Sequence, residues 1–343
     1  MRKVNEENER IKRKYLQYRR TAQRKDDTTI DKDANAILHF EYSTNYASFK
    51  KFRIEQAIRY RDKLENETSR TTGKPLAKAT ISKRLAGIKA FFFWLAGQPG
   101  YKSRIRYSDA DYFNMDAKGQ RVAHAVRDRP YPSLEMVRHA FMQMPASTDI
   151  ERRNAAILAF LMISGARDGA AASLRLKHIN LVDGYVFQDA REVKTKNSKT
   201  FTTYFMPVDQ IYIDCFRNWV QYLRSALLFG PDDPLFPPPK MGVLEGQFSV
   251  IGLKRETYQN ANALRAVVKQ AFEGADLPAF APHSFRKTLT KWADRKYQTR
   301  EAFKAFSQNI GHESVVTTVS AYCPVSTERQ GELIKSPKEN EAG

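Results

Sequence analysis

The sequence has few of the residues that build disulfide frameworks or metal sites. It contains two cysteines, Cys215 and Cys323, and six histidines among its 343 residues. Two cysteines are too few for a disulfide framework, and no Cys-x-x-Cys pair or His/Cys cluster has the spacing of a zinc site. We therefore expect a protein that has no structural disulfide, no bound metal and no other cofactor.

Long hydrophobic runs are also lacking. The first residues, MRKVNEENERIKRKYLQ, include no apolar stretch of the kind found in signal peptides. No later run reaches the length of a membrane span. These absences predict a soluble cytoplasmic protein with no membrane partner.

Acidic residues are scarce relative to basic ones. The chain has 57 Lys and Arg against 38 Asp and Glu, a formal net charge of +19. Such an excess favours a polyanionic partner, because neutralising phosphates releases their counterions. Charge alone does not separate nucleic acid from a membrane surface or from a basic protein without such a partner, but nucleic acid is the favoured interpretation.

The length predicts two domains plus tails, and local composition suggests where they divide. The expected segments are a basic N-terminal arm (1–27), a helical domain (28–113), a basic linker without steady periodicity (114–131), a second domain (132–323) and a polar C-terminal tail (324–343).

The clearest helix in the first domain lies within residues 80–100. Its apolar residues alternate at spacings of four and three and so form one stripe, and Gly97, Pro99 and Gly100 end the helix. The stripe consists of Ile81, Leu85, Ile88, Phe92 and Leu95. Lys83, Arg84 and Lys89 lie off it and are candidate DNA-binding residues, although exposed basic residues on helices are more often only solvated.

The second domain combines helices with a small sheet. Residues 154–167 are apolar nearly all round, which predicts a buried helix, and residues 282–297 predict another that begins at Pro282. Residues 185–208 are rich in Val, Thr, Phe and Tyr, with a turn expected at Asn197–Ser198. The predicted fold is mainly α, with a small antiparallel β-sheet in the C-terminal domain.

Several residues of the second domain suit metal-free chemistry on a phosphodiester. Without a metal, side-chain cations must stabilise the negative charge of the transition state, and arginine suits this role because its planar fork matches phosphate and stays charged. Arg167 follows a buried helix, and His283 and Arg286 share one face near a helix N-terminus. Taken singly, each of these features is common in proteins of any function.

The ordered set of motifs resembles the tyrosine recombinase (phage integrase) family. "ISGARDGAAASLRLKHIN" (163–180) resembles the first family box and "HSFR" (283–286) the second. "GHESVVTTVSAY" (311–322), with its paired threonines 317 and 318, resembles the third. The resemblance spans about 163–322 and extends weakly to 80–97. It implies a two-domain DNA clamp, with a helical core-binding domain followed by an α+β catalytic domain.

The resemblance also implies roles for individual residues. Tyr322 attacks a DNA phosphate and forms a 3′-phosphotyrosine. Arg167 and Arg286 hold the nonbridging oxygens, and His283 accepts the tyrosine proton or contacts the phosphate. Lys194 protonates the departing 5′-oxygen, and His312 donates a hydrogen bond to the phosphate. The implied partners are double-stranded DNA with a specific recombination site and three further copies of the chain on that DNA, the free protein being a monomer. The implied location is the prokaryotic nucleoid.

Two positions depart from the family pattern or leave it ambiguous. The family usually has an acidic residue three positions after the first arginine, where this chain has Ala170 and only the neighbouring Asp168 is acidic. The lysine is ambiguous because "VKTKNSKT" offers Lys194, Lys196 and Lys199. Lys194 is our first choice, and Lys196 is both the alternative acid and a candidate DNA contact.

Two other functions fit the same motifs. A type IB topoisomerase-like enzyme would use the same residues to relax supercoiled DNA. A catalytically decayed recombinase would act as a DNA-binding accessory protein, and Ala170 is the best support for that alternative.

Overall fold

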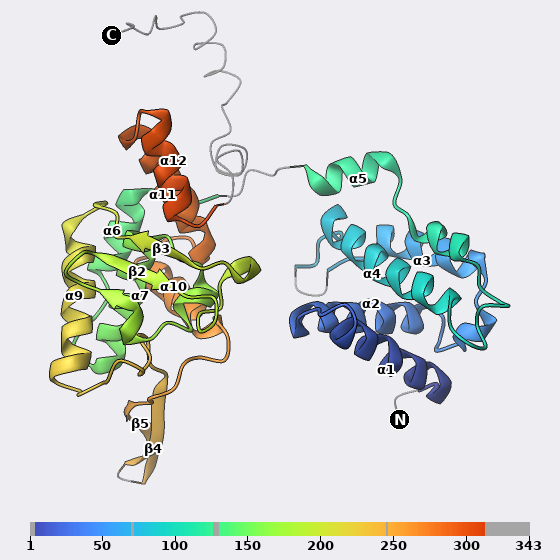
Figure 1. Cartoon of the computed structure of the whole chain (residues 1–343), viewed down its shortest axis with the longest axis horizontal. Coiled ribbons are helices and arrows are strands. Elements are labelled where there is room, and N and C mark those ends of the chain that lie inside the picture. Colours follow the sequence, from blue (N-terminus) through green and yellow to red (C-terminus); the bar gives the residue numbers. More distant parts are fainter. Residues whose placement is uncertain (1–3, 70–71, 126–129, 245, 313–343) are drawn as a thin grey trace, which may run out of the picture. The chain divides into compact units, whose positions relative to one another are not determined.

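The computed structural model describes residues 4–69, 72–125, 130–244 and 246–312, and it divides into two compact units, Met1–Arg127 and Asp128–Gly343 (Figure 1). Tyr322 and the expected tail (324–343) lie outside the described residues. No described helix has the length and apolar character needed to cross a membrane.

The first unit is a bundle of helices. Its elements are α1 (Glu6–Thr21), α2 (Asp27–Ser43), η1 (Phe49–Lys51), α3 (Ile54–Asn66), α4 (Lys78–Ala96), η2 (Tyr107–Phe113) and α5 (Ala117–His124). The apolar stripe predicted for α4 is confirmed, because all five of its residues are buried. Phe40, Phe92 and Phe113 pack edge-to-face or tilted against one another, with ring centroids 5.1–5.5 Å apart. Each such ring stabilises the bundle by about 1.5–3 kcal/mol.

The arm, for which we expected either a helix or disorder, and the linker both contain helices that pack on this unit. The expected arm (1–27) contains α1, whose Ile11 and Tyr15 belong to the core of the first unit. The expected linker (114–131) contains α5, which begins after Asp116, whose side chain accepts a hydrogen bond from the Gly119 amide. In α1 the basic residues outnumber the buried apolar ones, and in α5 Gly119 is the one buried residue, so the buried side of each helix is small.

The second unit is built around α7. Its helices are α6 (Leu134–Met142), α7 (Asp149–Ser164), α8 (Asp168–Ala171), α9 (Gln210–Ser225), α10 (Asn262–Glu273), α11 (Pro282–Lys296) and α12 (Arg300–Asn309), with short turns η3 (Leu176–His178) and η4 (Lys196–Ser198). The buried helix predicted at 154–167 is confirmed, but it begins at Asp149, because Thr148 and Glu151 form a capping box. From Ala155 to Ser164 every residue of α7 is buried.

A three-stranded antiparallel sheet, in the order β1-β2-β3, lies beside these helices (Figure 1). Its strands are β1 (Ile179–Asn180), β2 (Tyr185–Gln188) and β3 (Phe201–Tyr204). The predicted sheet and turn are confirmed, since Asn197 and Ser198 both have positive φ between β2 and β3. Asn309 joins the end of α12 to β3, because its side chain bonds both the amide and the carbonyl of Tyr204. The fold is therefore mainly α with a small antiparallel sheet, as predicted.

A second hairpin was not predicted. β4 (Pro239–Leu244) pairs antiparallel with β5 (Gln247–Leu253), and the hairpin projects from the rest of its unit (Figure 1). Its apolar residues, such as Val243 and Phe248, are exposed. Strands are predicted from apolar residues that alternate with polar ones because one face is buried, and this hairpin has no such buried face among its described residues.

Candidate active site

One small pocket of the second unit brings together chain segments that are far apart in sequence. These are the α7–α8 junction, the β2–β3 hairpin, α11 and the residue after α12. The lining residues are Ser164, Gly165, Ala166, Arg167, Ala170, Gln188, Thr195, Lys196, Phe201, Thr203, Arg286 and Ile310. Three of the cations singled out from the sequence, Arg167, Lys196 and Arg286, therefore line a single pocket.

Gly165 makes this convergence possible. It ends α7 with a φ of +59°, a conformation that glycine adopts without steric cost. A Cβ at this position would lie 3.2 Å from both Ile310 Cγ2 and Leu289 Cδ1. The reversal of the chain at Gly165 places Arg167 directly before α8, at the pocket.

Arg286 is held by several contacts. Its side chain is buried, with a relative exposure of 2% for the residue. Nη1 donates to the Gly165 carbonyl (2.5 Å), and Nη2 donates to the Ile310 carbonyl (2.8 Å) and lies 2.8 Å from His312 Nε2. These three acceptors are neutral, so they orient the guanidinium without cancelling its charge. A fixed cation in a buried pocket favours a bound anion.

His312 is held in its neutral form beside Arg286. Burial, and then the nearby Arg286, Arg167, Lys196 and His283, lower the pKa of His312 to about 3. Because a guanidinium can only donate, Nε2 must be the acceptor, which assigns the imidazole proton to Nδ1. His312 can thus act as a hydrogen-bond donor through Nδ1 without adding a charge.

Gly311 brings His312 against the sheet. Its φ is +74°, and a Cβ there would lie 2.6 Å from Phe201 Cζ. The backbone of the Gly-His segment therefore touches the same strand that follows the lysine-bearing turn.

Arg167 and His283 lie at the beginnings of helices. Arg167 is half-buried and is the N-cap residue of α8. His283 is exposed in the first turn of α11, which begins with Pro282, and it precedes Arg286 by one helical turn. Arg167 lines the pocket, and the charges of Arg167 and His283 both contribute to the lowered pKa of His312.

The structure places the candidate lysines differently. Lys196 lines the pocket, whereas Lys194 is not among the lining residues and its Nζ donates to the Gln259 carbonyl (2.8 Å). Lys199 lies with Nζ 5.9 Å from the centre of the Phe201 ring. The geometry favours Lys196 over Lys194, our first choice, because only the former is brought to the two arginines.

Ala170 and Asp168 provide no carboxylate at the pocket. Ala170 is a buried part of its lining. The Asp168 carboxylate accepts a hydrogen bond from Arg265 of α10. Neither Asp168 nor Arg265 is among the residues that line the pocket. The acidic residue that the family pattern leads one to expect is therefore not replaced by its neighbour.

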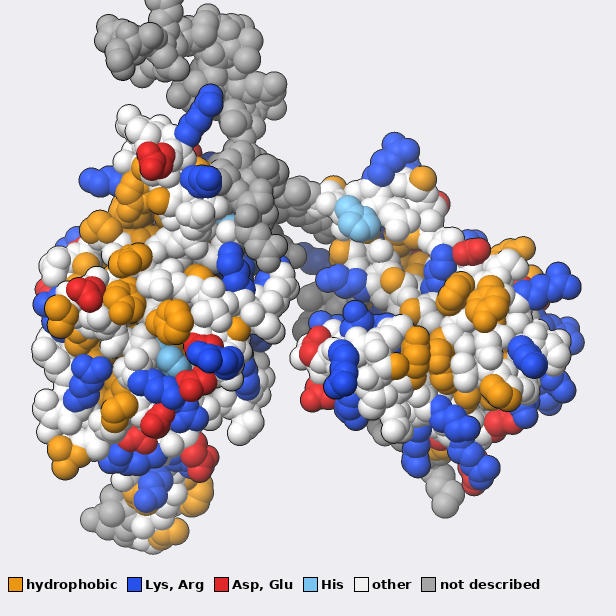
Figure 2. Space-filling view, in the orientation of Figure 1, with side chains coloured by type: hydrophobic (Ala, Val, Ile, Leu, Met, Phe, Trp, Pro, Cys, Tyr) orange, Lys and Arg blue, Asp and Glu red, His pale blue; other side chains and the backbone are white. Residues whose placement is uncertain are grey.

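The candidate DNA-binding residues of α4 differ in their surroundings. Lys83 is exposed. Arg84 pairs with Glu67 at 3.3 Å, and Lys89 pairs with Asp111 at 2.8 Å. On the face shown in Figure 2, Lys and Arg side chains are scattered over each unit with Asp and Glu among them. Charge is thus partly balanced within the helical unit itself.

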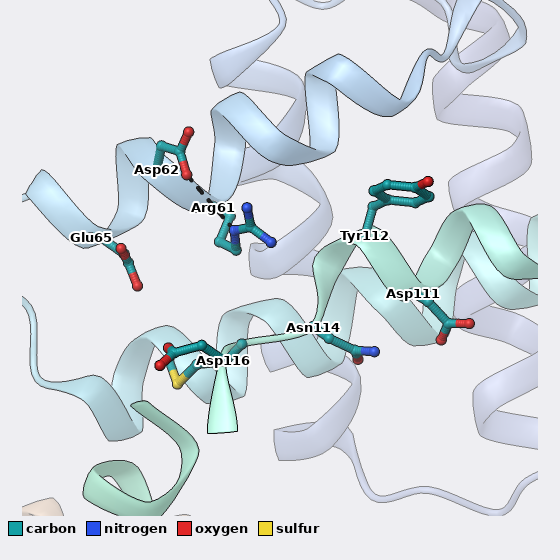
Figure 3. A pocket seen from close by; sticks show the side chains of 8 residues that line it. Arg61, Asp62, Glu65, Asp111, Tyr112, Asn114 and Asp116 are labelled. Carbon is teal, nitrogen blue, oxygen red and sulfur yellow. Dashed lines mark ion pairs between the residues drawn. The ribbon is translucent and has the colours of Figure 1, made fainter. Parts of the chain in front are cut away.

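A larger hollow in the helical unit has the wrong charge for a phosphate. Four carboxylates line it, together with Arg61, Tyr112, Asn114 and Met115 (Figure 3). The carboxylates are those of Asp62, Glu65, Asp111 and Asp116. Arg61, the one Lys or Arg in this lining, pairs with Asp62 at 3.7 Å. Lysines outside the lining pair with two of the carboxylates, Lys78 with Glu65 and Lys89 with Asp111, so the hollow keeps only a small acidic excess and offers no net positive charge to a phosphate.

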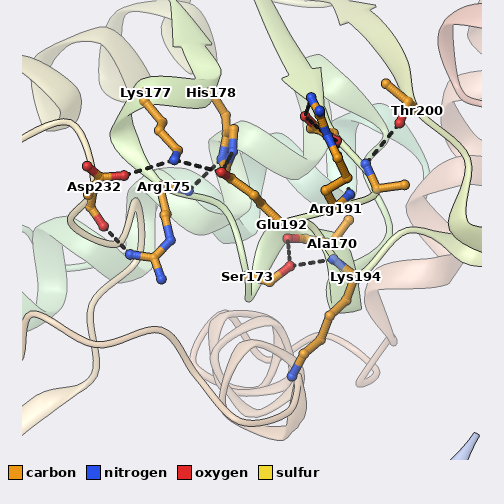
Figure 4. A network of polar contacts seen from close by, with 12 residues as sticks. Ala170, Ser173, Arg175, Lys177, His178, Arg191, Glu192, Lys194, Thr200 and Asp232 are labelled. Carbon is orange, nitrogen blue, oxygen red and sulfur yellow. Dashed lines mark hydrogen bonds and ion pairs between the residues drawn. The ribbon is translucent and has the colours of Figure 1, made fainter.

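Sequence reasoning missed the polar network that surrounds the lysine-bearing segment. Glu192 contacts both Lys177 and His178, and the Lys194 amide donates to Ser173 Oγ (Figure 4). Ser173, Lys177 and His178 lie within the first family box, but that pattern does not predict these contacts, because the partners are backbone groups or lie in other elements. The described residues also contain no group of three or more His, Cys, Asp or Glu side chains placed to hold a metal ion.

Comparison with known proteins gives consistent matches. The model of the phage integrase family matches residues 135–329. Tyrosine recombinase XerC from Escherichia coli O1:K1 is 22% identical over 310 residues, which cover 89% of this chain and 88% of that protein. A lambda integrase dimer bound to a COC′ core site has a TM-score of 0.63 at 11% identity, covering 92% and 94% of the two chains. A lambda integrase tetramer bound to a Holliday junction has a TM-score of 0.59 at 12% identity, covering 90% and 77%.

Proposed function

Because the chain belongs to the phage integrase family and is an enzyme of the tyrosine recombinase class, we propose that it is a site-specific DNA recombinase. It cleaves and rejoins DNA strands through a 3′-phosphotyrosine, without metal or ATP. The observation that carries this proposal is the convergence of Arg167, Lys196 and Arg286 on one pocket beside a neutral His312.

The two arginines bind the phosphate at which the strand is cut. Arg286 is held by backbone carbonyls, so it is oriented before DNA arrives, and Arg167 approaches from the start of α8. Preorganised donors of this kind stabilise developing negative charge with little reorganisation. His312 adds a neutral donor through Nδ1.

The chemical step exchanges one phosphodiester for another. The Tyr322 oxygen forms a bond to phosphorus while the bond from phosphorus to the 5′-oxygen breaks. The phenol proton passes to His283, and the leaving 5′-oxygen takes a proton from the Lys196 ammonium. The reverse sequence joins the strand to a new 5′-hydroxyl, so the bond energy is conserved.

We assign the general acid to Lys196 because it lines the pocket, whereas the Lys194 ammonium donates a hydrogen bond to the Gln259 carbonyl. This choice is tested with DNA that carries a 5′-bridging sulfur at the cleavage site. A thiolate leaves without a proton, so this substrate should restore cleavage by Lys196→Ala and should leave the deficit of Lys194→Ala, if any, unchanged.

The partner is double-stranded DNA with a specific recombination site, and the protein acts in the bacterial cytoplasm at the nucleoid. The net charge of +19 and the relatives' DNA-bound structures support this partner. The helical unit, which comprises the expected domain 28–113 and the basic α1 packed in its core, forms the core-DNA-binding domain, and 132–323 form the catalytic domain. Four copies assemble on two DNA duplexes, as in the lambda integrase tetramer on a Holliday junction.

The experiment that tests the proposal uses a nicked suicide substrate. After cleavage, the short fragment that carries the free 5′-hydroxyl diffuses away, and rejoining is prevented. The wild-type chain should accumulate a covalent protein–DNA adduct that survives denaturation. Strand exchange between two short duplexes, measured beside relaxation of supercoiled DNA, distinguishes a recombinase from a topoisomerase. Relaxation without exchange would contradict the proposal.

One observation favours a second candidate, a decayed recombinase that only binds DNA. Ala170 provides no carboxylate, and Asp168 contacts Arg265 instead. Specific DNA binding with no adduct on the suicide substrate would support this candidate.

A further inference from the structure

Ser173 connects the segment that carries the candidate lysines to the helix that begins after Arg167. Its Oγ accepts a hydrogen bond from the Lys194 amide (2.9 Å) and donates to the Ala170 carbonyl (3.0 Å) (Figure 4). Ser173 has a relative exposure of 5%. A hydrogen bond in such a buried place matters because its loss leaves the amide unsatisfied.

The contact lies between two of the cations that line the pocket. Arg167 caps α8, and its carbonyl accepts a bond from the Ala171 amide (2.9 Å). On the other side, Lys196 follows the anchored Lys194 amide by two residues, and Thr195 turns back to bond the Val193 carbonyl (2.7 Å). One hydroxyl thus links the arginine-bearing helix to the chain immediately before Lys196.

Other contacts hold the same segment at residues that are more distant in sequence from Lys196. The Ala190 amide donates to Thr200 Oγ1 (3.0 Å), and Glu192 accepts from His178 (2.9 Å). The Glu192 side chain is 40% exposed, and exposed ion pairs contribute little to rigidity. Of these three contacts, that of Ser173 is the closest in sequence to Lys196 and the most buried.

We propose that Ser173 is a positioning residue, which holds the Lys194–Lys196 segment so that the Lys196 ammonium reaches the departing 5′-oxygen. The inference rests on the proposed function, in which Lys196 gives its proton to that oxygen as the bond to phosphorus breaks. Ser173 itself contacts neither the DNA nor the reacting atoms.

The test compares cleavage of an ordinary substrate with cleavage of the same DNA carrying a 5′-bridging sulfur. Ser173→Ala should cleave ordinary DNA about tenfold more slowly, a fraction of the loss expected when an acid is removed outright. It should cleave the sulfur-containing DNA at close to the wild-type rate. The ratio of the two rates is unaffected by the fraction of folded enzyme, so a loss of stability alone cannot produce this result.

Two further variants make each outcome decisive. Lys196→Ala should show the same rescue with a larger loss on ordinary DNA, about 100-fold or more. Thr288→Val removes another buried hydroxyl, which donates to the Pro132 carbonyl, and should slow both substrates by one common factor.

The possible failures are distinguishable. If Lys196→Ala is rescued while Ser173→Ala slows both substrates equally, the role of Ser173 is refuted and the proposed function stands. If Lys196→Ala is not rescued, Lys196 is not the acid and the inference falls with that assignment. If no variant or wild-type chain forms an adduct, the proposed function itself is wrong.

Discussion

Arg286 Nη2 and His312 Nε2 lie 2.8 Å apart, and both residues are buried. The contact joins a permanently charged donor to an imidazole that is kept neutral. It fixes the tautomer of His312 and adds a partner to Arg286 beyond the carbonyls that hold it. The pocket consequently carries positive charge that comes from the arginines and Lys196, with none from His312.

The low pKa of His312 predicts an acid-sensitive fold. With a pKa of about 3 when folded and about 6.5 when unfolded, His312 binds its proton only on unfolding between these pH values. Stability should therefore fall as pH drops below 6.5, by at most about 1.4 kcal/mol per pH unit. Urea unfolding of wild type and His312→Gln at pH 7.5 and 5.5 measures this, and an equal pH dependence in both proteins would contradict it.

The two arginines should respond differently to replacement by lysine. Arg286→Lys cannot reproduce the bonds to both carbonyls, so it should lower the melting temperature and reduce adduct formation about 100-fold. Arg167 is half-buried at a helix start, so Arg167→Lys should reduce adduct formation with little change in melting temperature. Calorimetry beside the suicide-substrate assay separates these effects. Equal melting temperatures for the two variants would argue against the buried role of Arg286.

Gly311 should be irreplaceable because of Phe201. Gly311→Ala places a methyl group 2.6 Å from the ring and imposes a positive φ on alanine, whereas Gly246→Ala, with φ +77°, meets nothing within 4 Å. The second variant therefore measures backbone strain alone, about 1–2 kcal/mol. Gly311→Ala should cost more, and Phe201→Ala should relieve part of that excess in the double variant. Equal losses of stability for the two glycine variants would remove the steric argument.

Two lysines of α4 should contribute differently to DNA binding. Lys78 pairs with Glu65 at 3.2 Å, whereas no ion pair of Lys83 is recorded within the part of the chain that the structure describes. If Lys83 contacts a phosphate, Lys83→Ala should reduce the slope of log affinity against log salt by about 0.9. Lys78→Ala should change it less. Fluorescence anisotropy at salt concentrations between about 50 and 300 mM, over which the Debye length shortens about 2.5-fold, provides the slopes. A larger change for Lys78→Ala would reverse the assignment.

Cleavage should not require a divalent cation, because the proposed chemistry takes its positive charge from Arg167, Arg286 and Lys196. Addition of EDTA should leave the rate of adduct formation unchanged within about twofold, since chelation removes no group that stabilises the transition state. Restoration of a lost activity by Mg²⁺ alone would contradict this scheme.

Sequence patterns predicted the helices whose apolar residues pack together into the core of their unit. The stripe of α4 and the apolar α7 are of this kind, and both helices are present. The sequence does not predict that α1 and α5 pack on the helical unit, because few of their residues are buried and most of the others are charged or polar. The β4–β5 hairpin escaped prediction for a related reason, since its apolar residues are exposed.

The candidate site was predictable only where residue type and spacing decide the geometry. Gly165 and Gly311 precede Arg167 and His312 in recognisable motifs, and both have the positive φ that explains a glycine there. Lys194 and Lys196 could not be separated, because the choice depends on which amine turns toward Gln259 and which lines the pocket. The bond between Ser173 and the Lys194 amide joins a side chain to a backbone group, for which no sequence pattern exists.

Tyr322, which lies outside the described residues, should become covalently joined to DNA held by the arginine pocket. Mass spectrometry of the peptide that remains attached to DNA after digestion of the suicide-substrate adduct tests this without intermediaries. We predict a phosphotyrosine at 322, and we predict that Tyr322→Phe binds the same DNA with unchanged affinity and forms no adduct. An adduct on another residue, or one that persists in Tyr322→Phe, would contradict it.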